Sequence, residues 1–399
     1  MVTSSVGFVR QAAQAVVIGA SVVAGMSWPV AAAAQDATTE LVWPLPPDAA
    51  RIRYVGALRA ESDLGKKGSF LGGLSRAVTG KKSDELSILR PNDVYAADST
   101  RVYVSDGAAG VVMVFDRASK EMRIIGGKGG FGALMKPMGL GGDGRGRLYV
   151  ADQSAHRVVM FGPNEEFLAA FGGPSQLLNP VDVAVDADAD RIYIADSYLH
   201  QVVVYNHAGA IVQRLGRDVG DLAAKRAQAR AAGDSSSHGV QAHYQGTSRD
   251  LVENRGAAPG EFRYPLSVAV APDGTLYVSD GLNFRVQAFD REGTHLFSVG
   301  RLGDTPGSLA RPKGIAVDSE GHLYVVDAAF NNLQMFDGEG QLLMSFGSVG
   351  VGAGQLWLPM GTHVDQHGTI YVADRYNDRI QVFQYLPVEE SAADNRESN

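Results

Sequence analysis

The chain of 399 residues contains no cysteine, which excludes disulfide bridges and thiolate metal sites. Basic residues are also in the minority, because 36 Lys and Arg stand against 44 Asp and Glu and give a formal charge of -8. A surface that neutralises nucleic-acid phosphates needs clustered Lys and Arg. We therefore expect no nucleic-acid partner.

Long apolar runs are scarce too, and the one that exists lies at the N-terminus. Arg10 is the only charged residue before Asp36, and an Ala/Val-rich segment from Ala12 to Val23 follows it. This layout predicts a secretory signal peptide over residues 1–34, cleaved after Ala34. The alternative is an uncleaved membrane anchor, but the run is shorter than the roughly 20 residues of a membrane span. We expect a periplasmic or extracellular protein with no transmembrane segment after signal cleavage.

Six copies of one unit fill most of the remaining chain. In each copy a short apolar segment ends in Asp, with a Tyr three residues earlier, a Pro about fifteen residues earlier and an aromatic residue nine residues later. The six aspartates are Asp106, Asp152, Asp196, Asp280, Asp327 and Asp374. The six prolines are Pro91, Pro137, Pro180, Pro265, Pro312 and Pro359. A period of 40 to 50 residues is typical of propellers and solenoids.

Each unit has the pattern of four short antiparallel strands. Residues 314–318 and 323–327, for example, are apolar and β-branched segments separated by a turn that contains Gly321. Turn residues recur between such segments, and helix patterns are nearly absent from this region. Four antiparallel strands form one propeller blade. We predict an all-β fold, a six-bladed β-propeller.

These repeats resemble the NHL-repeat family of six-bladed β-propellers. The resemblance is carried by stretches such as Pro312–Asp318 and Val372–Phe383, and it covers residues 90 to 384. Three copies have the arginine that is usual in the family, namely Arg157, Arg285 and Arg379. The other three copies have Val111, Gln201 and Asn332 there. The resemblance implies a structural role for the arginines, which we expect to pair with polar groups between blades.

Strand counting predicts how the ring closes. The sixth copy supplies three strands and then continues into a polar tail, residues 386–399. An open blade would expose a sheet edge, which proteins avoid. The extended, β-branched segment 51–56 is therefore predicted to be the outer strand of blade six, after a stiff, extended lead-in at 43–47. The organisation expected is an N-terminal segment 35–89 with this strand and a short helix, followed by a propeller over 90–385.

Two segments depart from the repeat. The insertion 218–254 separates copies three and four, and it is either a lid or docking element or a solvated loop without function. Residues 58–89 contain Lys66, Lys67, Arg76, Lys81 and Lys82 around an apolar set with helical spacing. This segment is either a short helix packed under the propeller or a contact for an anionic surface.

In a four-stranded blade, the start of the first strand, the end of the second and the start of the third lie on one face. The loops after each Asp and the residues after each Pro therefore meet at one mouth of the central channel. Lyases that resemble this repeat place zinc-binding histidines directly after the Pro. Here those positions hold Asn92, Met138, Val181, Leu266, Lys313 and Met360. We therefore predict no metal site and no cofactor of that kind.

Scattered residues leave a cation site open. Asp93 and Asp182 lie one position further along two strands and could bind a cation in the channel, although one blade separates them. His156 and His200 are equivalent in neighbouring copies, and His363 lies in the first strand of copy six. We expect these histidines to be structural rather than metal ligands.

Aromatic and amide side chains decorate the loops of the same mouth, and such side chains suit recognition of peptides or glycans. The alternative is that these rings only pack between blades. The candidate ligand-binding residues are Asp93, Asp182, Tyr198, Asn283, Phe284, Phe330 and Tyr376.

No catalytic constellation is recognisable, so the sequence favours an exported, non-catalytic scaffold that binds a protein or peptide at the channel mouth, with a glycan as another possible ligand. The enzyme alternative is a metal-dependent lyase or hydrolase with its site in the channel. RNA binding, which occurs in intracellular proteins resembling this repeat, is disfavoured by the acidic charge and the export signal.

Overall fold

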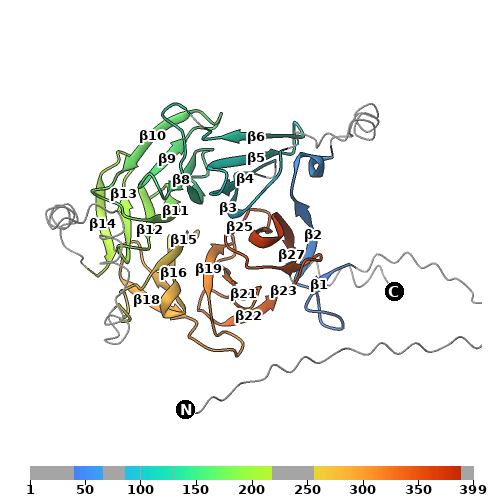
Figure 1. Ribbon diagram of the computed structural model, residues 1–399. Helices are drawn as coiled ribbons and strands as arrows, with labels where there is room; N and C mark the ends of the chain where they lie inside the picture. The colour runs from blue at the N-terminus through green and yellow to red at the C-terminus, as the bar shows by residue number, and fades with distance from the viewer. Residues whose placement is uncertain (1–39, 66–85, 99, 128, 218–255, 388–399) are drawn as a thin grey trace, which may run out of the picture. The chain divides into compact units, whose positions relative to one another are not determined.

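The computed structural model describes residues 40–65, 86–98, 100–127, 129–217 and 256–387 (Figure 1). The expected signal peptide, the insertion 218–254 and most of the polar tail lie outside these residues, as does the apolar part of the helix expected within 58–89. The described part of that segment forms only a short 3-10 helix, η1 (Glu61–Leu64).

Six four-stranded antiparallel blades follow one another around a central channel, as predicted (Figure 1). Blade one consists of β3 (Pro91–Ala96), β4 (Arg101–Asp106), β5 (Val111–Asp116) and β6 (Glu121–Ile125). Blade two consists of β7 (Pro137–Gly142), β8 (Leu148–Asp152), β9 (Arg157–Phe161) and β10 (Phe167–Gly172). Blade three consists of β11 (Pro180–Asp186), β12 (Arg191–Asp196), β13 (Gln201–Tyr205) and β14 (Ile211–Gly216). The repeated Pro begins the innermost strand of each of these blades, and the repeated Asp ends the second.

Blades four and five continue the pattern. Blade four consists of β15 (Pro265–Val270), β16 (Leu276–Asp280), β17 (Arg285–Phe289) and β18 (His295–Val299), with the 3-10 helix η2 (Gly281–Asn283) between its second and third strands. Blade five consists of β19 (Pro312–Val317), β20 (Leu323–Asp327), β21 (Asn332–Phe336) and β22 (Leu342–Phe346). A small parallel pair, β23 (Ser348–Val349) and β24 (Gln355–Leu356), then leads into blade six.

Blade six joins the two ends of the chain, which confirms the predicted closure. Its strands are β25 (Thr362–Val364), β26 (Thr369–Asp374) and β27 (Arg379–Tyr385), with η3 (Arg375–Asn377) between the last two. The N-terminal β2 (Ile52–Leu58) pairs antiparallel with β27 and aligns Ile52 with Tyr385 and Tyr54 with Phe383. The strand starts within the predicted segment 51–56 and runs two residues beyond it.

The lead-in predicted to be extended folds back instead. β1 (Val42–Trp43) pairs antiparallel with β2 and adds a fifth strand to blade six. Trp43 packs edge-on against Phe383, with the ring centroids 5.7 Å apart. The expectation of a straight lead-in is wrong because this ring gains a buried contact in the hairpin that an extended segment would not offer.

Each interface between neighbouring blades has its own apolar cluster. Blades one and six, for example, share Val102, Val104, Tyr371, Ile380 and Val382, and η1 adds Leu64 to the same cluster. The repeated tyrosines contribute to these interfaces and are almost wholly buried. The apolar side chains of the strands therefore stabilise the contact between blades as well as the blade itself.

Replacing Ile52 tests whether the N-terminal strand stabilises the whole ring. Ile52 is 0% exposed and packs with Phe383 and Val364 between blades five and six. We expect Ile52→Ala to lower the free energy of unfolding by about 2–5 kcal/mol, because a large side chain is lost from a closed core. Urea denaturation measures this.

The matched control lies on the same strand. Val55 is 57% exposed, and we expect Val55→Ala to change stability by no more than about 0.5 kcal/mol. Equal effects of the two substitutions would show that β2 does not hold the ring closed.

Candidate functional site

The six repeated aspartates fix the loops around the channel mouth. All six side chains are 0% exposed. Each accepts hydrogen bonds from backbone N–H groups just before the Pro of its own blade. Asp106 accepts from Leu89 and Arg90, both at 2.9 Å. Asp196 accepts from Leu178 at 2.6 Å and Asn179 at 3.0 Å.

In several blades the same carboxylate also holds the loop that follows it. Asp106 accepts from the N–H groups of Ala108 and Ala109 at 3.1 and 3.0 Å. Asp327 accepts from Ala329 and Phe330 in the same way. One buried carboxylate thus holds both the entry and the following loop at the mouth. Burial raises the pKa of Asp196, and the N–H donors oppose that shift.

The three family arginines pair with these aspartates. Arg379 lies 2.7 Å from Asp374, Arg285 lies 3.0 Å from Asp280 and Arg157 lies 3.7 Å from Asp152. Arg379 also donates to the carbonyl groups of Gly352 and Gln355, in the segment that enters blade six. Arg157 and Arg285 likewise donate to carbonyl groups in the connection that enters their blade. The arginines therefore pair with the Asp of their own blade and with polar groups between blades, as expected.

Residues two positions after each Pro form the inner ring of the channel. They are Asp93, Gly139, Asp182, Ser267, Gly314 and Gly361. A Cβ on Gly139 would lie 2.0 Å from Asp182 Oδ1, and a Cβ on Gly361 would lie 1.9 Å from Asp93 Oδ1. The glycines therefore leave room for the carboxylates of the following blades.

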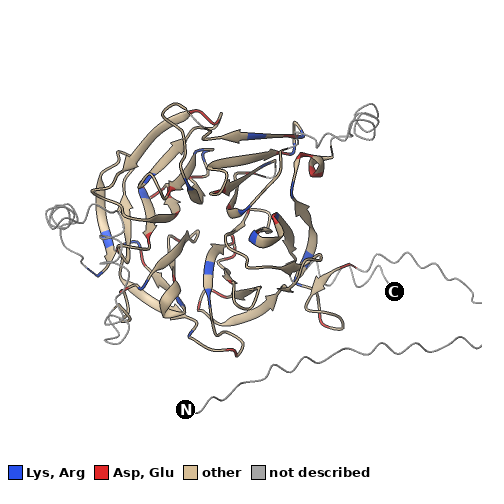
Figure 2. Ribbon diagram, viewed as in Figure 1, with Lys and Arg blue, Asp and Glu red and all other residues tan. Residues whose placement is uncertain are grey.

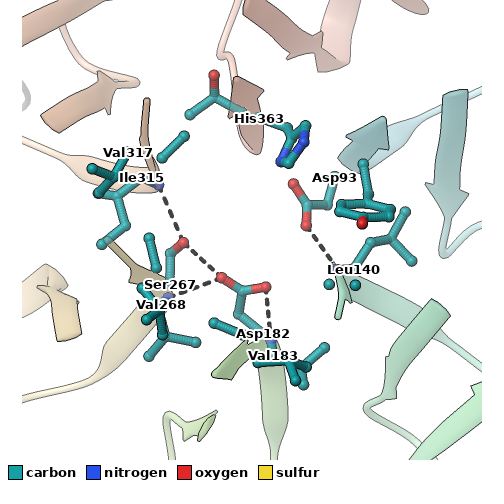
Figure 3. Close-up of a pocket in the computed structure, with 18 of the residues that line it drawn as sticks. Asp93, Leu140, Asp182, Val183, Ser267, Val268, Ile315, Val317 and His363 are labelled. Atoms are coloured by element: carbon teal, nitrogen blue, oxygen red, sulfur yellow. Dashed lines mark hydrogen bonds between the residues drawn. The ribbon is translucent and has the colours of Figure 1, made fainter. Parts of the chain in front are cut away.

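Both channel aspartates link blades, as Figure 3 shows. Asp93 accepts from the N–H of Leu140 in blade two at 2.8 Å. Asp182 accepts from Ser267 Oγ at 2.6 Å and from the N–H of Val268 at 2.9 Å, both in blade four. The Ser267 hydroxyl in turn accepts from the N–H of Ile315 in blade five at 3.2 Å.

Burial shifts the acidity of this pair. It raises the pKa of Asp182 to about 6, against the hydrogen bonds of Ser267 and Val268 that favour the ionised form. Burial also raises the pKa of Asp93 well above its usual range, and the charge of Asp182 raises it further. The two carboxylates therefore interact electrostatically across blade two.

A cavity of about 130 Å³ lies inside the channel and is lined by Asp93, Asp182, Ser267 and His363 (Figure 3). The His363 ring stands edge-on to Tyr95, with the centroids 4.8 Å apart. Burial lowers the pKa of His363 to about 4, so its imidazole is neutral at pH 7. The cavity therefore brings together a neutral imidazole and two carboxyl groups, a combination that can hydrogen-bond a small polar ligand.

Within the described residues, no group of three or more His, Asp or Glu side chains is arranged to hold a metal ion. His156 and His200 occupy equivalent turns with positive φ of 56° and 55°. His156 Nδ1 lies 2.7 Å from the carbonyl oxygen of Leu178, and His200 Nδ1 accepts from the N–H of Tyr264 at 2.9 Å. Each histidine thus ties its turn to the next blade.

The candidate residues predicted at the mouth fall into two groups. Asn283 is engaged in the fold, since its amide donates to the Gly256 carbonyl and to Asp280, both at 2.7 Å. Phe284, Phe330 and Tyr198 are only partly exposed, and Tyr198 packs against Tyr264 with a centroid distance of 5.9 Å. Tyr376, in contrast, is exposed.

Sequence reasoning missed the residue that pairs with Tyr376. Trp357 is exposed, its ring centroid lies 6.0 Å from that of Tyr376, and its carbonyl accepts the Tyr376 N–H at 3.1 Å. The sequence feature that could have identified Trp357 is its position two residues before Pro359. The backbone N–H at this position donates to the repeated Asp, here Asp374 at 2.7 Å, so its side chain starts from the mouth.

No helix in the described part of the chain is long and apolar enough to cross a membrane.

Comparison with known proteins supports the repeat assignment. Four stretches match the NHL repeat, at residues 177–205, 262–289, 309–336 and 356–383. They cover copies three to six. Copies one and two fall outside these matches but form blades of the same kind.

One curated relative is peptidyl-glycine alpha-amidating monooxygenase A of Xenopus laevis, 26% identical over 191 residues, which is 45% of this chain and only 17% of that protein. Among solved structures, an auxiliary nutrient binding protein from Bacteroides thetaiotaomicron VPI-5482 superposes with a TM-score of 0.52 at 10% identity, over 76% of this chain and 71% of that one. A protein of unknown function from the same organism gives a TM-score of 0.50 at 16% identity, over 74% and 70%. These two likenesses concern the fold alone.

The channel carboxylates make stability depend on pH in a defined direction. The folded pKa of Asp182, about 6, lies above the usual value of about 3.9. Its contribution is therefore fully present below about pH 4 and is lost as the pH rises through 6. We expect the free energy of unfolding of the wild type, relative to Asp182→Asn, to fall by up to about 3 kcal/mol between pH 4 and 7.

Urea denaturation over this pH range measures the difference. Part of it belongs to Asp93, whose pKa the Asp182 charge also raises. The control is Asp273→Asn, in an exposed turn. The difference in free energy of unfolding between this variant and the wild type should not change with pH. A difference between wild type and Asp182→Asn that grows with pH would contradict the assignment.

Proposed function

We propose that this six-bladed β-propeller, four of whose blades match the NHL repeat, is a rigid platform that binds a peptide or protein ligand across the loop-bearing mouth of its channel. We also propose that the protein acts outside the cytoplasm. The support for this location is the signal-peptide pattern of residues 1–34. Binding rather than catalysis is its role.

The observation that carries the proposal is an exposed aromatic pair on fixed loops. Trp357 is 47% exposed and Tyr376 is 52% exposed. The buried Asp374 carboxylate orders both loops. It accepts the backbone N–H of Trp357 and the side-chain amide of Asn377, the residue after Tyr376. Large rings on ordered loops bind with little loss of conformational entropy, which favours affinity.

Further apolar side chains extend this surface. Met135 and Leu89 are exposed, and each lies two residues before the Pro that begins its blade. Their backbone N–H groups are held by Asp152 and Asp106. The same position in three blades thus presents a large side chain at the mouth, which suits a peptide lying across the channel.

A metal-dependent lyase or hydrolase in the channel is the second candidate. Its site would be the cavity that His363 shares with Asp93 and Asp182, although these described side chains are not arranged as a set of three metal ligands. Metal analysis of the purified protein separates the two. Stoichiometric metal that is lost together with an activity would replace the platform by the enzyme.

A random peptide library panned against the immobilised full chain tests the platform. We expect enriched peptides to lose at least about thirty-fold in affinity on the double substitution Trp357→Ala and Tyr376→Ala, since exposed aromatic anchors commonly contribute about 2 kcal/mol or more to binding. Fluorescence anisotropy measures the affinities.

Leu343→Ala is the control, because Leu343 is 48% exposed but lies on the outer strand β22 of blade five. It should leave peptide affinity unchanged. Peptides that bind the double variant as tightly as the wild type would exclude the aromatic pair as the binding surface.

A further inference from the structure

Three cationic side chains start from blades five and six at the mouth. Arg311 and Lys313 flank Pro312 at the start of β19, and Arg375 begins η3. Figure 2 shows the basic segment on β19 at the inner edge of the ring. Arg375 reaches across to blade one and donates to Asn92 Oδ1. This grouping stands out in a chain with a formal charge of -8.

Lys313 is half-buried and forms no ion pair with an acidic side chain of the described residues. Loss of hydration, followed by the charges of Arg311 and Arg375, lowers the pKa of its ammonium group to about 8. No ion pair within the described part of the chain includes Lys313. Because the cation is partly removed from water and has two like charges beside it, an anion that reaches it is bound favourably.

The nearby carboxylates are engaged elsewhere. Asp93 and Asp182, which line the same opening, accept backbone N–H groups of Leu140 and Val268. Asp106 holds the entry to blade one. Asp378 is exposed and interacts with Arg90 rather than with Lys313. The charges that act on Lys313 are those of Arg311 and Arg375, and no carboxylate of the described residues forms an ion pair with it.

The opening beside Lys313 is small and has apolar walls. It measures about 70 Å³ and is lined by Met138, Val181, Leu266 and Met360, with Asn92, Asp93, Asp182, Ser267 and Lys313 as polar groups. Such a space accepts one charged group on an aliphatic stem. It does not offer the extended basic track that a nucleic-acid backbone needs.

We infer that this opening binds the carboxylate of an acidic side chain of a peptide ligand, with Lys313 as the central contact and Arg311 and Arg375 as flanking charges. The inference rests on the proposed function and specifies its ligand: a peptide with Asp or Glu next to an apolar residue. The apolar residue packs on Trp357 and Tyr376, and the carboxylate enters the opening.

Isothermal calorimetry of the full chain with acetyl-Ala-Glu-Ala-amide at pH 7 and low salt tests the inference, with the Gln peptide as the neutral control. We expect the Glu peptide to bind at least about ten-fold more tightly than the Gln peptide, and Lys313→Met to remove this preference. Lys313→Arg should retain it. Lys136→Met, which removes an exposed cation beside blade two, should have no effect.

A pH series excludes a purely structural role of Lys313. Between pH 7 and 9.5 the wild type should lose about ten-fold in affinity as Lys313 deprotonates, whereas the Lys313→Arg variant should not. Guanidinium groups do not lose their proton over this range. Any ionisation of Asp93 or Asp182 affects both proteins equally, so the difference between them reports Lys313.

Three results would overturn the inference: equal affinity for the Glu and Gln peptides, unchanged binding by Lys313→Met, or tighter binding of an oligouridine than of the Glu peptide. The two proposals fail separately. If the library peptides need Trp357 for binding but carry no acidic residue, the platform proposal is supported and the carboxylate site is excluded. If the Glu peptide binds through Lys313 but no library peptide needs the aromatic pair, the carboxylate site is supported and the aromatic platform is excluded.

Discussion

Six buried carboxylates hold the loops of the channel mouth in place. Each repeated Asp ends the second strand of its blade and accepts the backbone N–H groups that precede the first strand. These N–H groups lie in connections between blades, where a strand ladder cannot satisfy them. A buried carboxylate supplies the missing acceptors. The mouth is therefore built from ordered backbone, and its side chains start from fixed positions.

The same logic explains the arrangement inside the ring. Asp93 and Asp182 reach neighbouring blades across the space left by glycines, so the channel is narrowed by groups that also join the blades. Ring closure by β2 keeps these distances constant, because an open seam would let blades one and six move apart. A fixed ring with fixed loops is suited to present a surface, and the exposed pair Trp357 and Tyr376 and the cations around Lys313 lie on that surface.

Repetition made the fold predictable from the sequence. Four markers in six copies gave the number of blades, and the missing fourth strand of copy six identified 51–56 as its partner. The hairpin of Val42–Trp43 was not predictable, since two residues carry no periodic signal and their stability comes from tertiary contacts of Trp43. Within the blades, the sequence located the repeated Asp but gave no role to it.

The site was predictable only in outline. The sequence placed the loops at one mouth and named Tyr376, but it could not distinguish exposed rings from packed ones, because exposure depends on neighbours such as Tyr264 beside Tyr198. Asn283 was a candidate ligand contact, and its amide is used to hold the entry of blade four. Lys313 and Arg375 are distant in sequence, and only the closed ring brings them together.

Hydrogen exchange of the native protein tests the central claim, that buried carboxylates order the mouth. The amides of Lys136, Asn179 and Arg311 donate to Asp152, Asp196 and Asp327. The account predicts that they exchange within about ten-fold of a central strand amide such as that of Ile194, since both would require large-scale opening. Exchange of these three amides at the rate of an unstructured peptide, while Ile194 remains protected, would contradict it.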